Sequence, residues 1–329
     1  MATANPTVPS ASPVMGSRSF LSKLREGDEI ARLITFLFAA SVVLITVLLV
    51  YELWINSVLP RHKFGLHFFV TQVWDPVVDQ YGALPFVYGT LVTSAIALLL
   101  AVPLGIGASI FLAELAPPRI SDTLQFFIDL LAAVPSVIYG VLGVFIVVPL
   151  MRTVIYPALN KPFGYLPIFK GPSYGVGFLT AGIVLAIMVI PYIISVSREV
   201  LLSVPRDQRE AALALGSTRW ESTWKVVVPF ARTGIMGSIF LALARALGET
   251  MAVTMVIGNT PQIKASLFAA GDSIASVIAS QFTEATGDLY LQALIELGLV
   301  LFLLTFILNG LARLLIVVTT QKGSGKGNQ

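Results

Sequence analysis

Six long apolar segments constrain this chain more than any other feature of its sequence. They comprise residues 31–55, 86–113, 124–150, 177–197, 235–257 and 291–317. A helix needs about 20 residues to cross roughly 30 Å of hydrocarbon, and every segment reaches that length. The mean hydropathy of +0.85 is also well above that of soluble domains. The sequence therefore predicts an all-α integral membrane protein with six transmembrane helices.

The distribution of lysine and arginine predicts the orientation of these helices. Six crossings place both termini on one side of the membrane, where fourteen basic residues lie, against six on the other side. Cytoplasmic loops carry such an excess, so we expect both termini in the cytoplasm. This asymmetry accounts for the pI of about 9.1. We expect membrane lipid, and no nucleic acid, around the protein.

Both ends of the chain are predicted to lie outside the membrane domain. Residues 1–29 are rich in Ala, Ser, Pro and Thr before they become charged, which is typical of a flexible cytoplasmic tail. A cleaved signal peptide is the alternative, but the apolar run after Arg32 is too long for one and no small-residue cleavage pattern closes it. We expect a six-helix domain over residues 30–318 and a second cytoplasmic tail over 319–329.

Two long external loops are predicted, at residues 151–176 and 258–290. In the second loop, Asp272 and Ser273 precede apolar residues at helical spacing, which predicts a short capped helix. Those apolar residues are Ile274, Val277, Ile278 and Phe282.

The residue inventory argues against an enzyme. There is no cysteine for a disulfide, a thiolate nucleophile or a metal site, and His62 and His67 lie too far apart in a loop to indicate a metal. No acidic dyad, zinc-type His/Glu motif or Gly-x-Ser-x-Gly elbow is present. The phosphate-cradling G-x-x-x-x-G-K-[ST] motif is also missing, so nothing in the sequence binds ATP. We expect no cofactor.

A cytoplasmic segment at about residues 200–234 concentrates charge in this oily chain. Six of the 21 lysines and arginines lie between Arg198 and Arg232. One interpretation is an ordinary loop lying on the lipid headgroups, with tryptophans as interfacial anchors. The other is a docking surface for a soluble partner.

This segment is predicted to form a helix, a glycine turn and a second helix. Residues 206–215 are good helix formers, and Gly216 stands where a left-handed C-terminal cap is expected. Thr218 and Glu221 then match a capping box, which opens the second helix. We expect Pro229 to end that helix.

Two charged residues in the fifth predicted span are its most costly feature. A guanidinium at the bilayer centre costs about 2.5–3.5 kcal/mol on insertion scales, so Arg245 is predicted to face the bundle interior. Glu249 follows four residues later, on the same helix face and about 6 Å along the axis. The pair either locks packing, or Arg245 meets an oxyanion in a transport pathway while Glu249 orients it or competes for it.

Weaker candidates for contact with an anion lie beside these features. Pro135 is expected to kink the third span, and Ser136 next to it carries a hydroxyl donor. Thr250 follows Glu249. For both hydroxyls, satisfying the backbone is the plainer interpretation.

Residues 210–229 resemble the EAA loop of ABC importer permeases. The matching positions are Glu210, Ala211, Ala212, Gly216 and Pro229, with Val226 and Val228 where the family pattern has Ile and Leu. In that family the loop forms a coupling helix, which sits in a groove of the ATPase subunit and transmits its closure. The resemblance implies that role here, and small side chains at Ala211 and Ala212 fit a close approach.

Two further runs resemble PstC-type permeases of the phosphate ABC importer. "ALARALGETMAVTMVIGN" is similar to the fifth helix of that family, and "AAVPSVIYGVLG" to its third, within a likeness that covers about residues 86–318. The resemblance implies a type I ABC importer permease fold in the cell inner (plasma) membrane, which imports inorganic phosphate by alternating access. It also implies that Arg245 and Glu249 are a transport-critical pair.

The same resemblance implies partners. They are a second, PstA-like permease subunit, two ATPase subunits and an external phosphate-binding protein. A permease for a related oxyanion is the nearest alternative. A self-powered anion carrier would also use a buried charged pair, but it would leave the EAA segment unexplained.

Overall fold

The computed structural model describes the backbone of residues 28–324 and the side chains of residues 30–314. The predicted tail at residues 1–29 therefore lies almost entirely outside the described residues. Within them no β-strand occurs, and six helices are long and apolar enough to cross a membrane. These helices are Ile30–Ile55, Leu84–Leu115, Ser136–Phe163, Phe178–Leu202, Arg219–Leu247 and Asp288–Leu314. The prediction of an all-α chain with six apolar helices is confirmed.

The chain forms two compact units, and the second begins at Leu53. The unit before it contains most of helix α2 (Asp28–Ile55), and the unit from Leu53 onward contains all the other elements. In the second unit α3 (Val58–Phe64) and the 3₁₀ turn η1 (Gly65–Phe69) lead towards α4. The candidate site lies entirely in this second unit.

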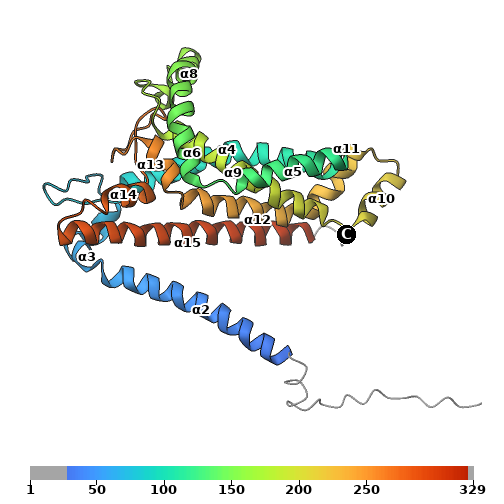
Figure 1. The fold of residues 1–329 in the computed structure, drawn as a ribbon, viewed down its shortest axis with the longest axis horizontal. Helices are drawn as coiled ribbons and strands as arrows, with labels where there is room; N and C mark the ends of the chain where they lie inside the picture. The colour runs from blue at the N-terminus through green and yellow to red at the C-terminus, as the bar shows by residue number, and fades with distance from the viewer. Residues whose placement is uncertain (1–27, 325–329) are drawn as a thin grey trace, which may run out of the picture. The chain divides into compact units, whose positions relative to one another are not determined.

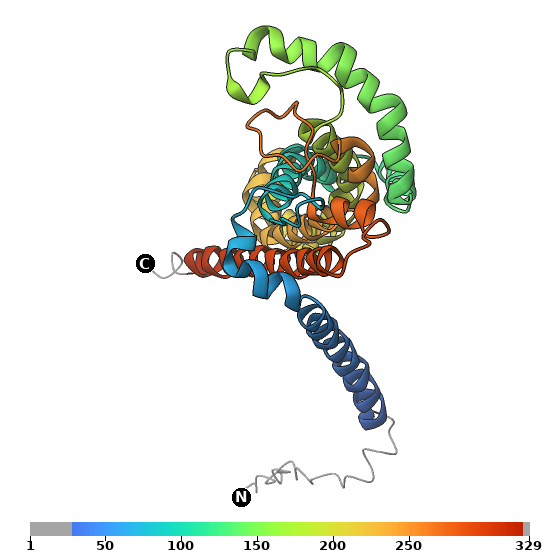
Figure 2. The same ribbon diagram turned by 90° about the vertical axis from the view of Figure 1, so that its left-hand side faces the viewer.

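The core of the second unit forms around α9 (Phe178–Leu202). Helices α4 (Leu84–Ile110) and α12 (Val228–Leu247) run alongside it, and α15 (Asp288–Ser324) packs on α12 (Figures 1 and 2). Gly105 permits the close approach of α4 to α9, since an added Cβ would lie 2.7 Å from Cγ2 of Ile193. Small residues at such contacts are the usual basis of helix packing in membranes. The α15 helix also continues past the predicted tail boundary at residue 319.

The predicted third span, residues 124–150, is wrong. Helix α5 (Pro118–Ala132) ends before Pro135, and a new helix, α6 (Ser136–Leu142), begins directly after it. The reason is that Pro135 has no N–H to donate and keeps the preceding residue out of helical geometry. The membrane-length helix is Ser136–Phe163, so the predicted loop at 151–176 begins as helix.

That helix contains several segments joined without a gap. After α6 come η3 (Gly143–Val147), α7 (Val148–Leu150), η4 (Met151–Ile155) and α8 (Tyr156–Phe163), where η3 and η4 are π-helical turns. Each π turn ends just before a proline-bearing helix start, at Pro149 and Pro157. A wider turn removes the clash between a proline ring and the preceding carbonyls, so the helix bends without breaking. The 3₁₀ turn η5 (Pro167–Phe169) follows in the loop.

A π turn also precedes Pro229, so the predicted end of the helix at this proline is wrong. Helix α11 (Arg219–Ser222) passes through the π turn η6 (Thr223–Val227) directly into α12, whose first turn contains Pro229. The break comes later, at residues 248–250, before the short helix α13 (Met251–Ile257). The predicted span at 235–257 is therefore two helices.

The predicted helix within loop 258–290 is confirmed. It is α14 (Ile274–Gln281), and the hydroxyl of Ser273 accepts a hydrogen bond of 3.2 Å from the N–H of Ser276. The backbone N–H of Ile274 donates to the hydroxyl of Thr90 on α4 at 3.0 Å. This contact fixes the start of α14 to the bundle.

Candidate functional site

Arg245 lies in the last turn of α12, beside the break in the fifth span. Its side chain is half-buried, and the guanidinium carbon is 5.8 Å from the ring centroid of Tyr192 on α9. Tyr139 on α6 is close enough to interact with its charge. The Nε atom is buried and has no hydrogen-bond partner among the described residues. A buried guanidinium N–H without an acceptor is a costly arrangement in a protein interior.

The expected shared face of Arg245 and Glu249 is wrong. Helix α12 ends at Leu247, and no ion pair joins the two side chains in the described part of the chain. Instead Oε1 of Glu249 accepts a hydrogen bond from the N–H of Ala252 at 3.3 Å, in the first turn of α13. The carboxylate thus satisfies a free N–H of the new helix, which explains why the chain leaves α12 here.

Ser136 lies at the same level as this break, on a different helix. An added Cβ at Gly140 on α6 would lie 3.1 Å from Cα of Ala252, and one at Gly143 would lie 2.9 Å from Cγ1 of Val256. These two contacts advance in the same direction along both helices, so α6 and α13 run parallel. One helical turn before Gly140 is Ser136, which the register places beside residues 248–250. Its side chain is half-buried and forms no hydrogen bond with the described residues.

The hydroxyl and carbonyl of Thr250 form hydrogen bonds within their own chain segment. Its hydroxyl donates to the carbonyl of Gly248 at 3.3 Å, and its carbonyl accepts from the hydroxyl of Thr254 at 2.7 Å. The plainer interpretation of this threonine, satisfying the backbone, therefore holds in this structure. Arg245, Glu249, Ser136 and Thr250 nevertheless gather around one helix break, which the predicted straight span did not include.

The predicted helix–turn–helix of the EAA segment is present. It begins with α10 (Arg206–Ala214), and Gly216 has a φ of +87°, in the left-handed region that favours glycine. The N–H groups of Gly216 and Ser217 donate to the carbonyls of Leu213 and Ala212, which is the hydrogen-bond pattern of a Schellman motif. Thr218 and Glu221 form both bonds of a capping box.

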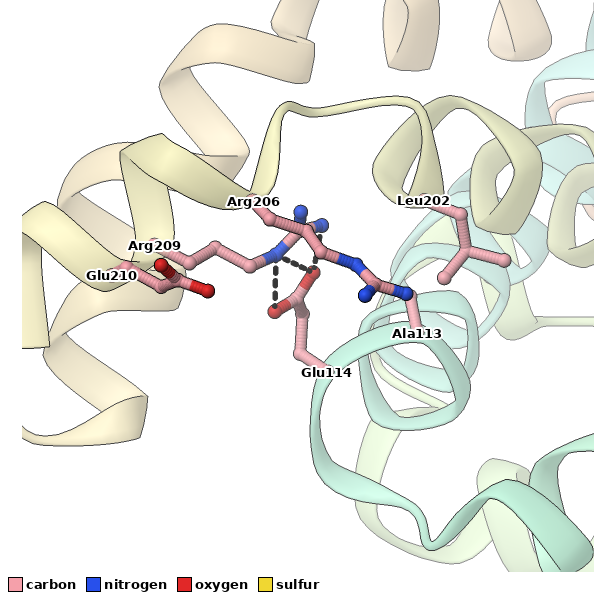
Figure 3. Close-up of a pocket in the computed structure, with 6 residues that line it drawn as sticks. All are labelled: Ala113, Glu114, Leu202, Arg206, Arg209 and Glu210. Atoms are coloured by element: carbon pink, nitrogen blue, oxygen red, sulfur yellow. Dashed lines mark hydrogen bonds and ion pairs between the residues drawn. The ribbon is translucent and has the colours of Figure 1, made fainter.

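The five coupling candidates differ in exposure. Glu210, Ala211, Gly216 and Pro229 are exposed, whereas Ala212 is only 7% exposed because it packs against the rest of the chain. Of the two alanines expected to allow close approach of a partner, only Ala211 is therefore accessible to one. A cavity of about 370 Å³ opens beside Glu210, between α10 and the ends of α4 and α9 (Figure 3).

Sequence reasoning missed an ion pair at this cavity. Arg209 on α10 binds Glu114, which lies in the π turn η2 (Phe111–Leu115) that continues α4. The Nη2–Oε1 distance is 2.7 Å. The two residues are 95 positions apart, and only the arginine beside the EAA motif carried a signal.

Two acidic residues outside this set are buried. Glu296 on α15 is 2% exposed and therefore does not reach the membrane interface. Asp272, just before α14, is 1% exposed, and its Oδ1 accepts from the N–H of Ser273 at 2.8 Å. Burial raises the pKa of Asp272 to about 7. No cluster of three or more potential metal ligands occurs among the described residues.

Comparisons with known proteins agree with this architecture. Residues 105–316 match the family of binding-protein-dependent transport system inner membrane components. A Mesorhizobium japonicum protein named phosphate transport system permease protein PstC is 45% identical over 84% of this chain and 87% of its own length. Proteins of the same name from Haemophilus influenzae and Pasteurella multocida are 47% and 49% identical, over 87% and 80% of this chain and 92% and 83% of their own lengths.

Solved structures are similar in fold alone. A chain of the inward-facing MetNI methionine ABC transporter has a TM-score of 0.56 at 16% identity, covering 75% of this chain and 99% of its own. A chain of a bacterial ABC transporter for alginate import has a TM-score of 0.51 at 18% identity, covering 86% of this chain and 98% of its own. The fold is that of type I ABC importer permeases.

Proposed function

Because this chain belongs to the PstC-type permeases, within the binding-protein-dependent transport system inner membrane components, we propose that it carries inorganic phosphate through the membrane, with Arg245 as the residue that meets the anion. It is a multi-pass inner membrane protein and a transport component rather than an enzyme. It works with other components of an ABC importer. Phosphate is the substrate named for its relatives.

The unpartnered Nε of Arg245 is the observation that carries this proposal. The buried Nε of this guanidinium has lost its contact with water, so a negative group beside it would offset that loss. Among the described residues no carboxylate lies within ion-pair distance of Arg245, and Glu249 bonds to α13 instead. A phosphate oxyanion offers acceptors that match the planar fork of arginine.

Glu249 has a defined part in this proposal. Its carboxylate lies near the same break but bonds to the backbone of Ala252, which leaves the guanidinium open. A rearrangement of the three residues between α12 and α13 would let Glu249 reach Arg245 once the anion has left. Ser136, at the level of this break on α6, supplies a hydroxyl donor to the same path. Thr250 is a weaker candidate, because its hydroxyl already bonds to Gly248.

We further propose the partners of this subunit. Exposed Glu210, Ala211 and Gly216 on and after α10 form the surface for an ATPase subunit, and two such subunits would supply the energy. A second, PstA-like permease would complete the pathway, and an external phosphate-binding protein would deliver the anion. Pro229 positions α12 at the end of this segment.

Uptake of radiolabelled phosphate by the reconstituted complex tests the proposal. We expect uptake that depends on ATP, is competed by unlabelled phosphate, and is unaffected by sulfate. Uptake of sulfate in place of phosphate would indicate a different oxyanion importer. Proton-coupled uptake by this chain alone in liposomes would contradict the proposal.

A further inference from the structure

Glu114 and Arg209 form the most extensively bonded ion pair of the described chain. Nε of Arg209 donates to both carboxylate oxygens of Glu114 at 3.2 Å, and Nη2 donates to Oε1 at 2.7 Å. The side chain of Arg209 is 20% exposed and that of Glu114 is 10% exposed. Figure 3 shows Glu114 reaching from the end of α4 towards the guanidinium on α10.

Arg209 also binds a third element. Its Nη2 donates to the carbonyl of Leu201 at 2.8 Å, and its Nη1 donates to the carbonyl of Val204. Leu201 lies in the last turn of α9, and Val204 follows that helix. Carbonyls at a helix end have no partner within the helix, so a cation there is favourable. One guanidinium thus joins α10 to the ends of both α4 and α9.

Little else fixes α10 to these two helices. Ala212 is its only buried side chain. Leu213, by contrast, is 43% exposed, and the cavity of about 370 Å³ separates part of α10 from the ends of α4 and α9. Apolar packing alone therefore couples α10 only weakly to α4 and α9.

We propose that Glu114 and Arg209 form a clamp that transmits movement of α10 to α4 and α9. The clamp rests on the proposed function, in which α10 docks on an ATPase subunit. Because α4 and α9 form the core of the bundle and α9 carries Tyr192 beside Arg245, a displacement of α10 reaches the transport path through two helices. Glu114 and Arg209 are positioning residues, since neither contacts substrate.

The ion pair suits this task better than an apolar contact. A bidentate guanidinium–carboxylate pair fixes both distance and orientation. A buried pair is also strongly coupled, because removing one partner leaves the other charge without compensation. A clamp of this type resists both sliding and rotation of α10 against η2.

The test is the number of phosphate ions imported per ATP hydrolysed by the full complex in liposomes. We expect Glu114→Gln and Arg209→Gln complexes to retain their ATPase subunits and hydrolyse ATP, while phosphate imported per ATP falls about tenfold or more. A merely structural role would lower the yield of complex but leave this ratio unchanged in the complexes that assemble. An unchanged ratio in both variants would overturn the clamp.

A matched control lies in the same segment. Lys225→Gln removes an ion pair with Glu221 whose side chains are 72% and 44% exposed, and we expect the ratio to stay at the parent value. If a single variant fails to assemble, the double variant Glu114→Gln/Arg209→Gln leaves neither charge unpaired, and its ratio decides in the same way. A parent complex without ATP-driven phosphate uptake would refute the proposed function, whereas parental uptake with unchanged ratios refutes only the clamp.

Discussion

Two arginines of this chain are held in opposite ways. Arg209 donates to a carboxylate and to two carbonyls, so every nitrogen of its guanidinium has a partner. Arg245 lies beside the ring of Tyr192, and its buried Nε has no acceptor in the described chain. A fully bonded guanidinium joins elements, whereas one with a free donor in a protein interior is available to a ligand. The contrast supports the two proposed roles, a clamp at Arg209 and an anion site at Arg245.

Replacing Arg245 tests this contrast with the largest expected effect. We expect Arg245→Gln to lower ATP-driven phosphate uptake about a hundredfold, equivalent to about 2.7 kcal/mol of lost stabilisation, because the fixed positive charge is gone. Tyr192→Phe is the control, since it keeps the aromatic face and should leave uptake close to the parent level. Equal uptake by the parent and Arg245→Gln would remove the distinction between the two arginines.

A substitution at Gly216 tests the segment around α10, which is proposed to dock on the ATPase subunit. Its left-handed φ of +87° costs a β-branched residue roughly 1–2 kcal/mol or more, so Gly216→Val should distort the end of α10. We expect the ATPase subunit to copurify at less than about a fifth of the parent level. Asparagine visits the left-handed region readily, so Gly216→Asn should retain most of it. Equal losses for both variants would show that side-chain bulk, rather than backbone geometry, matters.

A substitution at Gly140 tests the packing of α6 against α13, beside the helix break that follows Arg245. An added Cβ would lie 2.6 Å from Sδ of Met255 and 3.1 Å from Cα of Ala252, so Gly140→Ala should push α6 away from α13. We expect a destabilisation of about 1–3 kcal/mol, measured as a lower melting temperature of the detergent-solubilised chain. Gly107→Ala is the control, because nothing lies within 4 Å of its added Cβ. An unchanged melting temperature for Gly140→Ala would contradict this close packing.

The smallest expected effect concerns pH. Burial raises the pKa of Asp272 from 3.8 to about 7, so the folded protein binds a proton there that the unfolded chain releases above pH 4. The contribution of this group to stability therefore falls as pH rises from about 4 to 7. Asp272→Asn removes that loss. Relative to the parent, we expect its melting temperature to rise by a few degrees at pH 8 and to change little at pH 4.5. The same difference at both values would contradict a protonated Asp272.

The sequence predicted the spans well where one apolar run formed one helix. Residues 177–197 and 86–113 correspond to α9 and to α4 with η2 almost throughout. It failed at prolines, because the effect of a proline depends on the turn before it. Pro135 begins a new helix, whereas Pro149, Pro157 and Pro229 follow π turns and leave the helix continuous.

The sequence identified the residues of the candidate site better than it predicted their arrangement in space. A charge in an apolar run is visible in any sequence, which is why Arg245 and Glu249 stood out. After the break that follows Leu247, Glu249 bonds to the N–H of Ala252. Helical spacing in the sequence does not predict this hydrogen bond. Glu114 was missed because its partner lies 95 residues away. Local patterns predict caps and turns, as at Gly216, but not long-range pairs.

The most direct test of the central claim measures the electrostatic effect of Arg245 on Ser136, in the proposed transport path. The chain has no native cysteine, so Ser136→Cys gives it a single reactive thiol. Its rate of modification by a negatively charged methanethiosulfonate, divided by the rate for a positively charged one, reports the local potential. If Arg245 serves a passing anion, this ratio falls about tenfold in an Arg245→Gln background, and phosphate slows the negative reagent only when Arg245 is present. A thiol that neither reagent reaches during turnover, or a ratio that does not change, would contradict the account.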